Sequence, residues 1–326
     1  VEFGPVGFYI GARAFAHRRL HLLSVVILAA GTVGALTVIV EFLVGHKLFA
    51  DVLSYQWNQT TSTIFRPGGI FGGPPQAGEA LCFVLFFGLA AASGLHNRRR
   101  RLAAACIAVT VIALILTFTR ADLIAAAVGV LAYLWLVRSP LLRARIVLPV
   151  LATAGVVFLL VLPSLRQSTT IQEGFLRAGT LSQRYGYWTD ALPIATSSAH
   201  NFIFGAGTGL LEVPVVSQSA PVPVALAVRP QAYSNSLHSQ YVTTLVEEGM
   251  IGVAAVILVL VVPLLRSARV ARAEGHREYA AVCASLISVA IVMSVDTAIL
   301  DGVTFAMMMT AAGIAATAGR RRMGYS

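Results

Sequence analysis

Long apolar runs separated by short polar segments dominate the chain. A membrane-spanning helix needs ~20 mostly apolar residues. Eight runs approach or exceed that length, at residues 20–44, 76–95, 102–119, 121–137, 146–162, 249–265, 279–295 and 302–319. The pattern predicts an all-α, polytopic helical membrane protein with about eight transmembrane helices. We treat residues 1–326 as a single transmembrane domain.

The composition agrees with this prediction. Of the 326 residues, 57% are hydrophobic and only 12% are charged. These values exclude a disordered chain, a soluble globular enzyme and a disulfide-rich secreted scaffold. Three cysteines, Cys82, Cys106 and Cys283, all lie inside apolar runs and lack metal-ligand spacing. We interpret them as small buried hydrophobic residues and expect no metal site.

The net charge of +10 reflects membrane topology. Of the 24 basic residues, 17 fall in the alternate connections that share a side with Arg18 and Arg19, and seven fall on the other side. By the positive-inside rule, the first side is cytoplasmic. The charge therefore needs no nucleic-acid partner. The cytoplasmic connections are short and carry no nucleotide motif, so we expect no cofactor.

Two long connections lie on the extracytoplasmic side, at residues 46–75 and 163–237. We predict a large extracytoplasmic loop at 163–237. Loops longer than ~12–15 residues are usually functional or disordered. We therefore place the chemistry on the outer face. The Gly205–Gly209 stretch lacks the strand and the GK[ST] ending of a phosphate-binding loop, and we interpret it as a loop turn.

Two arginines stand at the outer ends of apolar runs. Arg66 precedes a segment rich in glycine and proline, which favours a rigid rim or, alternatively, an ordinary interfacial loop. Arg120 lies between two runs with almost no loop. A guanidinium offers a planar fork that suits phosphate. The alternative is an interfacial arginine whose charge reaches the membrane surface, paired with Asp122.

An arginine beside aromatic residues marks the predicted large loop. Arg184 is followed by Tyr185, Tyr187 and Trp188. The charge suits a phosphate and the ring faces suit a sugar. Packing of these rings at the membrane interface is the alternative, since tyrosine and tryptophan concentrate there.

His238 lies where a polar loop becomes an apolar helix, and Tyr241 follows it at the helical spacing that shares a face. A neutral imidazole can accept a proton, so His238 is the candidate general base, with His200 as its rival. Nine residues of straight helix would turn Glu247 away from His238. We interpret Asp296 and Asp301 as polar boundaries of a helical hairpin.

Several of these segments resemble the motifs of bacterial O-antigen ligases. His238-Ser239, nine further residues and then Gly249 to Gly252 resemble the family pattern H-[NSR]-x9-G-x-x-[GTY]. Thr119-Arg120-Ala121 is similar to its [ST]-R-[GAS] at a span junction. Residues 66–76 look like its R-x-x-G-x-F-x-x-P-N segment, with an extra Pro75 before Gln76, which stands where asparagine is usual. Residues 184–207 resemble its R-x3-W stretch that ends in G-x-G.

The resemblance implies a fold of the GT-C type and an enzyme of the O-antigen ligase and polymerase superfamily. Such an enzyme is a metal-independent, inverting glycosyltransferase without a nucleotide cofactor. It moves a preassembled glycan from a polyprenyl-pyrophosphate carrier to an acceptor hydroxyl on a glycan, lipid or protein. The location implied is the outer face of the bacterial inner (plasma) membrane. The family usually has more than eight spans, so we expect further helices ahead of Val1.

On this resemblance, His238 and Arg120 are the catalytic residues. Arg184, Arg66, Tyr187, Trp188 and Tyr241 would bind the substrate. Three other readings stay open: an O-antigen or exopolysaccharide polymerase, a flippase or transporter of a lipid-linked glycan, and a scaffold without activity.

Overall fold

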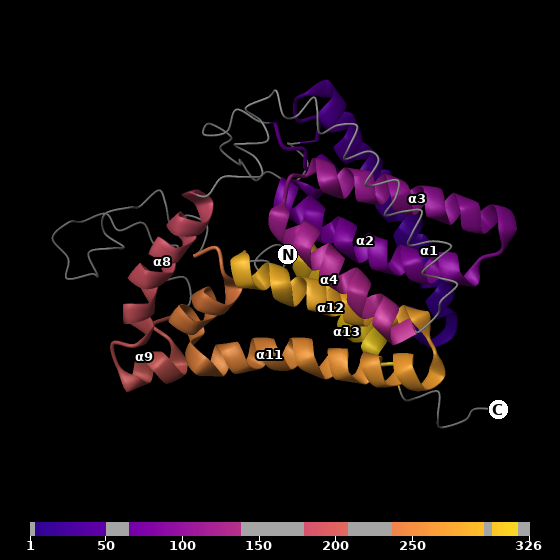
Figure 1. Ribbon diagram of the computed structural model, residues 1–326. Coiled ribbons are helices and arrows are strands. Elements are labelled where there is room, and N and C mark those ends of the chain that lie inside the picture. The colour runs from indigo at the N-terminus through magenta and orange to yellow at the C-terminus, as the bar shows by residue number, and fades with distance from the viewer. Residues whose placement is uncertain (1–3, 50–64, 138–178, 208–236, 297–301, 319–326) are drawn as a thin grey trace. The chain divides into compact units, whose positions relative to one another are not determined.

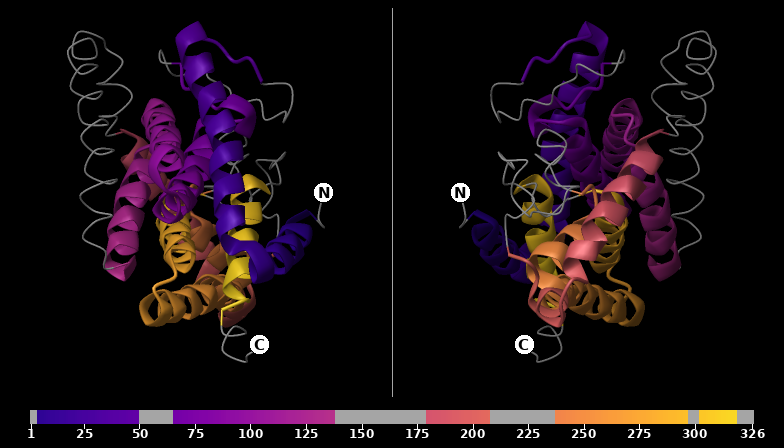
Figure 2. Two further views of the ribbon diagram at one scale, coloured as in Figure 1. Left: turned by 90° about the vertical axis from the view of Figure 1, so that its right-hand side faces the viewer. Right: turned by 90° about the vertical axis from the view of Figure 1, so that its left-hand side faces the viewer.

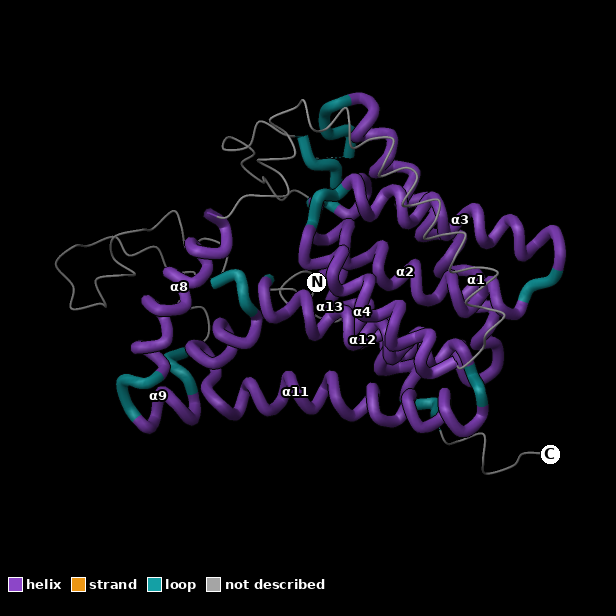
Figure 3. The backbone as a smooth tube through the Cα atoms, in the orientation of Figure 1, coloured by secondary structure: helices purple, strands orange, loops and turns teal. Residues whose placement is uncertain are grey.

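The computed structural model describes residues 4–49, 65–137, 179–207, 237–296 and 302–318. Within these residues every regular element is a helix (Figure 3). The elements are α1 (Gly4–Val44), the 3₁₀ turn η3 (Gly69–Phe71), α2 (Pro74–Gly94), α3 (Asn97–Leu116), α4 (Arg120–Val137), α8 (Gly179–Ala195), α9 (Ala199–Phe204), α11 (Gln240–Glu274), α12 (Arg277–Val295) and α13 (Gly302–Ala315). The all-α prediction is confirmed for this part of the chain.

Five helices are long and apolar enough to cross a membrane: the Arg19–Val44 part of α1, α2, α4, α11 and α12. A multi-pass membrane protein is therefore supported, but the eight predicted spans are not confirmed. The run at 146–162 lies outside the described residues. The apolar part of α13 is short (Thr304–Ala315). In α3, the arginines at 98–101 occupy the first turn and leave only residues 102–116 as an apolar stretch.

The described residues belong to two compact units, and each is described separately. The first unit comprises Val1–Leu176, Val262–Val289 and Asp301–Ser326. Within it α1 contacts α2, α3 and α13 (Figures 1 and 2), and α2 also contacts α4. Helix α2 forms the core of the unit, because nearly all of its side chains from Ala77 to Ala92 are buried. Its first turn contains Pro74 and Pro75, and proline suits a helix start because the first N–H groups have no partner there.

Small residues allow α1 to approach α2 closely. A side chain at Gly31 would collide with Val84, and a side chain at Gly88 would come within 2.9 Å of Leu28. Such close approach is how helices associate where no water can drive hydrophobic contact.

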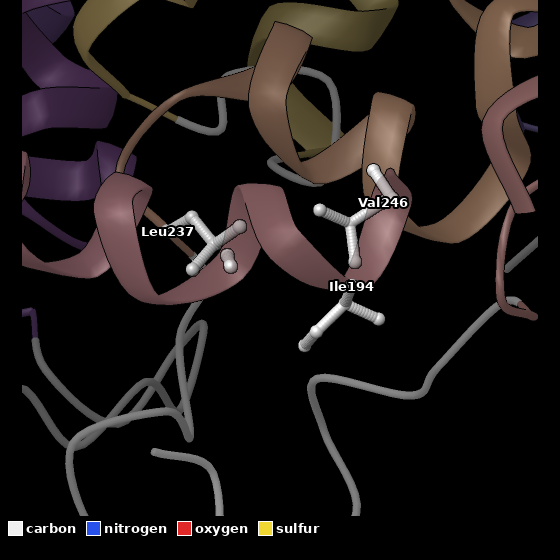
Figure 4. Close-up of a cluster of buried hydrophobic side chains, with 5 residues drawn as sticks. Ile194, Leu237 and Val246 are labelled. Atoms are coloured by element: carbon white, nitrogen blue, oxygen red, sulfur yellow. The ribbon is translucent and has the colours of Figure 1, made fainter. Parts of the chain in front are cut away.

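The second unit comprises Arg177–Val261 and Ala290–Leu300. Its core is a small apolar cluster formed by Ala191, Ile194 and Ala195 of α8 with Leu237 and Val246 (Figure 4). Tyr187 and Trp188 pack against this cluster.

The large loop predicted at 163–237 is not confirmed, and its described part contains the two helices α8 and α9. The apolar residues of α8 recur at intervals of three and four, which places them on one helical face. Burial of that face stabilises α8, although its sequence contains no long apolar run of the kind that spans a membrane. The rest of this segment, at residues 163–178 and 208–236, lies outside the described residues.

Candidate functional site

The candidate residues fall into two groups, one in each unit. We call Arg66 and Arg120 the arginine pair, and we call His238, Asp296 and the Arg184, Tyr187 and Trp188 face of α8 the histidine group. The pair belongs to the first unit and the group to the second.

Arg120 is the first residue of α4, directly after a tight turn. The turn is formed by Thr117, Phe118 and Thr119, and Phe118 adopts a positive φ of 55°. The two threonine side chains are buried and lie within hydrogen-bond distance, with 2.7 Å between their Oγ1 atoms. This internal bond satisfies polar groups that water cannot reach. The turn thus sets the start of α4, where Arg120 is half-buried.

The structure brings Arg66 to this same turn. Its Nε donates a hydrogen bond to the carbonyl oxygen of Thr117 over 3.1 Å. Arg66 thus binds the turn that directly precedes Arg120, although the two arginines are far apart in sequence. A pair of guanidinium groups is a suitable binding site for a phosphate.

The turn also packs closely against α2. A Cβ at Gly78 would collide with the carboxylate of Asp122 and with Oγ1 of Thr119. Asp122 is buried in the first turn of α4, where the positive end of the helix dipole stabilises a negative charge. Glycine at position 78 is therefore what permits this approach.

His238 lies two residues before α11, in a left-handed conformation with φ of 48°. Its Nδ1 is 3.9 Å from Oδ1 of Asp296, and both side chains are partly exposed. The backbone N–H of Gln240 donates to the carbonyl oxygen of Asp296 over 3.0 Å. The start of α11 is thereby fixed to the end of α12. The sequence indicated a hairpin boundary at Asp296 and gave no sign of its proximity to His238.

One face of α8 contacts the His238 segment. The ring of Tyr187 lies 6.2 Å from the imidazole of His238, measured between centroids. The indole Nε1 of Trp188 donates to the carbonyl oxygen of Leu237 over 2.8 Å. Arg184 is three and four residues before these two, which places it on the same helical face. The loop position expected for these three residues is corrected to a helix.

Tyr241 has a different environment from the one expected. Its hydroxyl donates to the carbonyl oxygen of Ala290 on α12, over 3.1 Å. Because α11 begins at Gln240, His238 and Tyr241 do not lie on one continuous helix. The observed contact of Tyr241 joins α11 to α12. The rival base, His200, packs against Phe204 of its own helix, with 5.2 Å between ring centroids.

A break in α11 follows the His238 segment. At Gly249 the backbone has φ of 67° and ψ of −165°, which only glycine adopts readily. The carbonyl groups of Val246 and Glu247 accept hydrogen bonds from the N–H groups of Ala206 and Gly207, over 2.8 and 3.1 Å. The Gly205–Gly207 segment therefore supplies donors to a helix interrupted at Gly249. This is the physical role of the turn identified in the sequence.

Gly205 and Gly249 contact each other closely. A Cβ at either position would collide with backbone atoms of the opposite segment, those of Glu247 for Gly205 and those of Ile203 for Gly249.

Within the described residues, no cluster of three or more His, Cys, Asp or Glu side chains is arranged to hold a metal ion.

A comparison with curated proteins found no match. Residues 102–257 match a family model described as O-antigen ligase. The matched region includes Arg120, Arg184, His238 and Gly249, while Arg66 and Asp296 lie outside it. This match over residues 102–257 supports the O-antigen ligase superfamily, whose members are membrane enzymes that process glycans.

Proposed function

We propose that the chain is a glycosyltransferase that moves a preassembled glycan from a polyprenyl-pyrophosphate carrier to an acceptor hydroxyl. The family match supports this class of reaction. The observation that carries the proposal is the contact between His238 and Asp296, because it gives a histidine at the start of a membrane helix the carboxylate partner of a general base.

In this proposal, Asp296 orients the imidazole and stabilises its charged form. With Nδ1 turned to the carboxylate, Nε2 is the nitrogen that accepts the proton of the acceptor hydroxyl. General base catalysis of this kind typically contributes ~10²–10⁴-fold to the rate. Tyr187 lies beside the imidazole and, with Trp188 and Tyr241, we assign it to the binding of the substrate.

The arginines are assigned to the pyrophosphate. As the glycan leaves its carrier, negative charge develops on the bridging oxygen, and charge-assisted hydrogen bonds from Arg120, Arg66 and Arg184 would strengthen. Each such bond is worth ~1.5–3 kcal/mol. Stronger binding in the transition state than in the ground state is what accelerates a reaction.

The bond changes are those of a single displacement. The acceptor oxygen forms a bond to the anomeric carbon, the bond from that carbon to the pyrophosphate oxygen breaks, and the polyprenyl pyrophosphate departs with the electron pair. The proton of the hydroxyl goes to Nε2 of His238. The anomeric configuration is inverted, and the pyrophosphate link supplies the driving force. The proposal needs neither a metal nor a nucleotide.

We place the reaction on the extracytoplasmic face of a bacterial inner membrane. The bias of the arginines supports this orientation, because the opposite connections carry 17 of the 24 basic residues. Arg66, Arg120 and His238 all lie at connections on the other side, which carries only seven of the 24 basic residues.

A transfer assay tests the proposal. The purified chain in lipid nanodiscs is given a polyprenyl-pyrophosphate oligosaccharide and a cell-envelope extract as acceptor pool, and products are identified by mass spectrometry. We expect free polyprenyl pyrophosphate together with a new glycoconjugate. One donor glycan on a different acceptor identifies a ligase, and donor glycans joined in series identify a polymerase. Movement of intact donor across a vesicle membrane without its cleavage would contradict the proposal and identify a flippase.

A further inference from the structure

A buried carboxylate holds the loop that carries Arg66. Glu41 lies in the last turn of α1, with 1% of its surface exposed. Its Oε1 accepts hydrogen bonds from the N–H groups of Leu48 and Phe49, over 3.0 and 3.3 Å. Its Oε2 accepts from the N–H groups of Gly68 and Gly69, over 3.0 and 2.8 Å. One side chain thus joins two loop segments through four backbone donors.

The backbone at Gly68 and Gly69 is shaped to bind an anion. Gly68 has φ of −117° and ψ of −16°, in the right-handed region, and Gly69 has a positive φ of 55°. Successive residues of opposite hand turn their N–H groups toward one point and form an anion-binding concavity. In this chain Glu41 supplies the anion.

The same face of α1 binds the rest of the loop. The N–H of Ile70 donates to Oγ1 of Thr37 over 3.1 Å, and a Cβ at Gly34 would collide with the ring of Phe71. Positions 34, 37 and 41 recur at intervals of three and four, so they lie on one side of the helix. The 3₁₀ turn η3 therefore packs on α1. Of the loop residues that contact this face, Gly68 and Gly69, which bind Glu41, are the nearest in sequence to Arg66.

A continuous set of contacts leads from this carboxylate to the arginine pair. Glu41 binds the N–H of Gly68, two residues after Arg66, and Arg66 binds the carbonyl oxygen of Thr117. Thr117 belongs to the turn that precedes Arg120. A group that is already ordered loses less entropy when it binds its ligand.

We propose that Glu41 is a positioning residue for Arg66. Its carboxylate fixes the Gly68-Gly69 concavity and so holds Arg66 ready for the pyrophosphate of the donor. This inference rests on the proposed assignment of Arg66 to that pyrophosphate. A carboxylate is required because a glutamine of equal size has only one acceptor oxygen, and its amide group would face N–H donors.

Hydrogen exchange tests the contact without any substrate. Glu41→Gln in nanodiscs should accelerate amide exchange at positions 68 and 69 by about tenfold or more, while exchange in α2 and α4 stays as in the wild type. Thr37→Val is the matched control, because it removes the two hydrogen bonds of the Thr37 hydroxyl, from Ile70 and to Gly34, on the same helical face and leaves the four bonds of Glu41 in place. Unchanged exchange at 68 and 69 in Glu41→Gln would overturn the inference.

Binding of a polyprenyl pyrophosphate without a glycan tests the consequence. Loss of one charge-assisted contact corresponds to about tenfold weaker binding or more. We expect Glu41→Gln and Arg66→Ala each to show this loss and the double variant to be no worse than Arg66→Ala, because coupled residues are not additive. Losses that multiply in the double variant would overturn the inference.

One outcome separates the inference from the proposed function. If Arg66→Ala binds the pyrophosphate as the wild type does, the assignment of Arg66 is wrong and the positioning role of Glu41 falls with it. If Arg66→Ala weakens binding and Glu41→Gln does not, only the inference about Glu41 is wrong.

Discussion

Nδ1 of His238 lies 3.9 Å from Oδ1 of Asp296, although 57 residues, those of α11 and α12 included, separate the two in sequence. His238 precedes α11 and Asp296 directly follows α12. A hydrogen bond from Gln240 to the carbonyl oxygen of Asp296 holds the two chain ends together. The carboxylate faces Nδ1 at a distance longer than a hydrogen bond, and such contacts of a general base often tighten only when the substrate binds.

Asp296→Asn should lower the turnover number without changing the donor KM. The amide keeps the size of the side chain but removes the charge that favours the protonated imidazole. We expect a decrease in kcat of ~10–100-fold, equivalent to a loss of ~1.4–2.8 kcal/mol of transition-state stabilisation. Initial rates at varied donor concentration measure this. Asp190→Asn is the control, because Asp190 is an exposed carboxylate on α8. Equal effects of the two substitutions, or a change in KM alone, would exclude a positioning role for Asp296.

Arg120→Lys should impair transfer nearly as much as Arg120→Ala. Lysine keeps the charge but loses the planar fork that binds phosphate in two places. We expect at least a ~10-fold loss of kcat/KM in both variants, the value of one charge-assisted bond. Arg98→Lys provides the control, because Arg98 is exposed in the first turn of α3. Full activity of Arg120→Lys would show that charge alone is needed.

Trp188→Phe tests the support that α8 gives to the His238 segment. The substitution keeps an aromatic ring and removes the indole N–H that binds the carbonyl oxygen of Leu237. A hydrogen bond of this kind contributes ~0.5–1.5 kcal/mol. We expect faster amide exchange around position 238 and a reduced kcat. Trp135→Phe, on an exposed part of α4, should do neither. Wild-type exchange in Trp188→Phe would mean that this bond does not hold the segment.

Gly249→Ala should destabilise the second unit. The substitution places a Cβ against backbone atoms of Ile203 and imposes a backbone conformation that costs about 1–3 kcal/mol for a residue other than glycine. The apparent melting temperature in detergent should fall by several degrees, and transfer should fall with it. Gly186→Ala is the matched control: Gly186 lies within α8 and nothing within 4 Å would meet a Cβ there. It should leave the melting temperature unchanged or raise it, because alanine favours the helix by about 1 kcal/mol. A similar response of the two variants would contradict the role assigned to the break.

The five helices that are long enough to cross a membrane coincide with predicted apolar runs, because such long runs have few alternatives. The junction at Arg120 was also visible, since only the three residues 117–119 separate α3 from α4. Helix α8 was missed because its segment has no continuous apolar run. Its signal was the spacing of Tyr187, Trp188, Ala191, Ile194 and Ala195, which matches one face of a helix.

Contacts between distant parts of the chain could not be predicted. Asp296 is an ordinary helix-end carboxylate in the sequence, and only the packing of α11 and α12 brings it to His238. The relation of the Gly205–Gly207 segment to Gly249 is similar, because the helix break at Gly249 is needed before the carbonyl groups of Val246 and Glu247 can accept outside donors. Glu41 is visible in the sequence only as an acid near the end of an apolar run, and its four partners could not be predicted because all of them are backbone groups.

Release of polyprenyl pyrophosphate under single-turnover conditions tests the central claim most directly. Wild-type chain and His238→Ala, each in nanodiscs, would be mixed with a labelled polyprenyl-pyrophosphate oligosaccharide and an acceptor. We predict release of the carrier and inverted transfer of the glycan in the wild type. In His238→Ala we predict a rate lower by ~10²–10⁴-fold with unchanged folding and donor binding. An equal rate of release in the two proteins would show that His238 is not the base and would contradict the account.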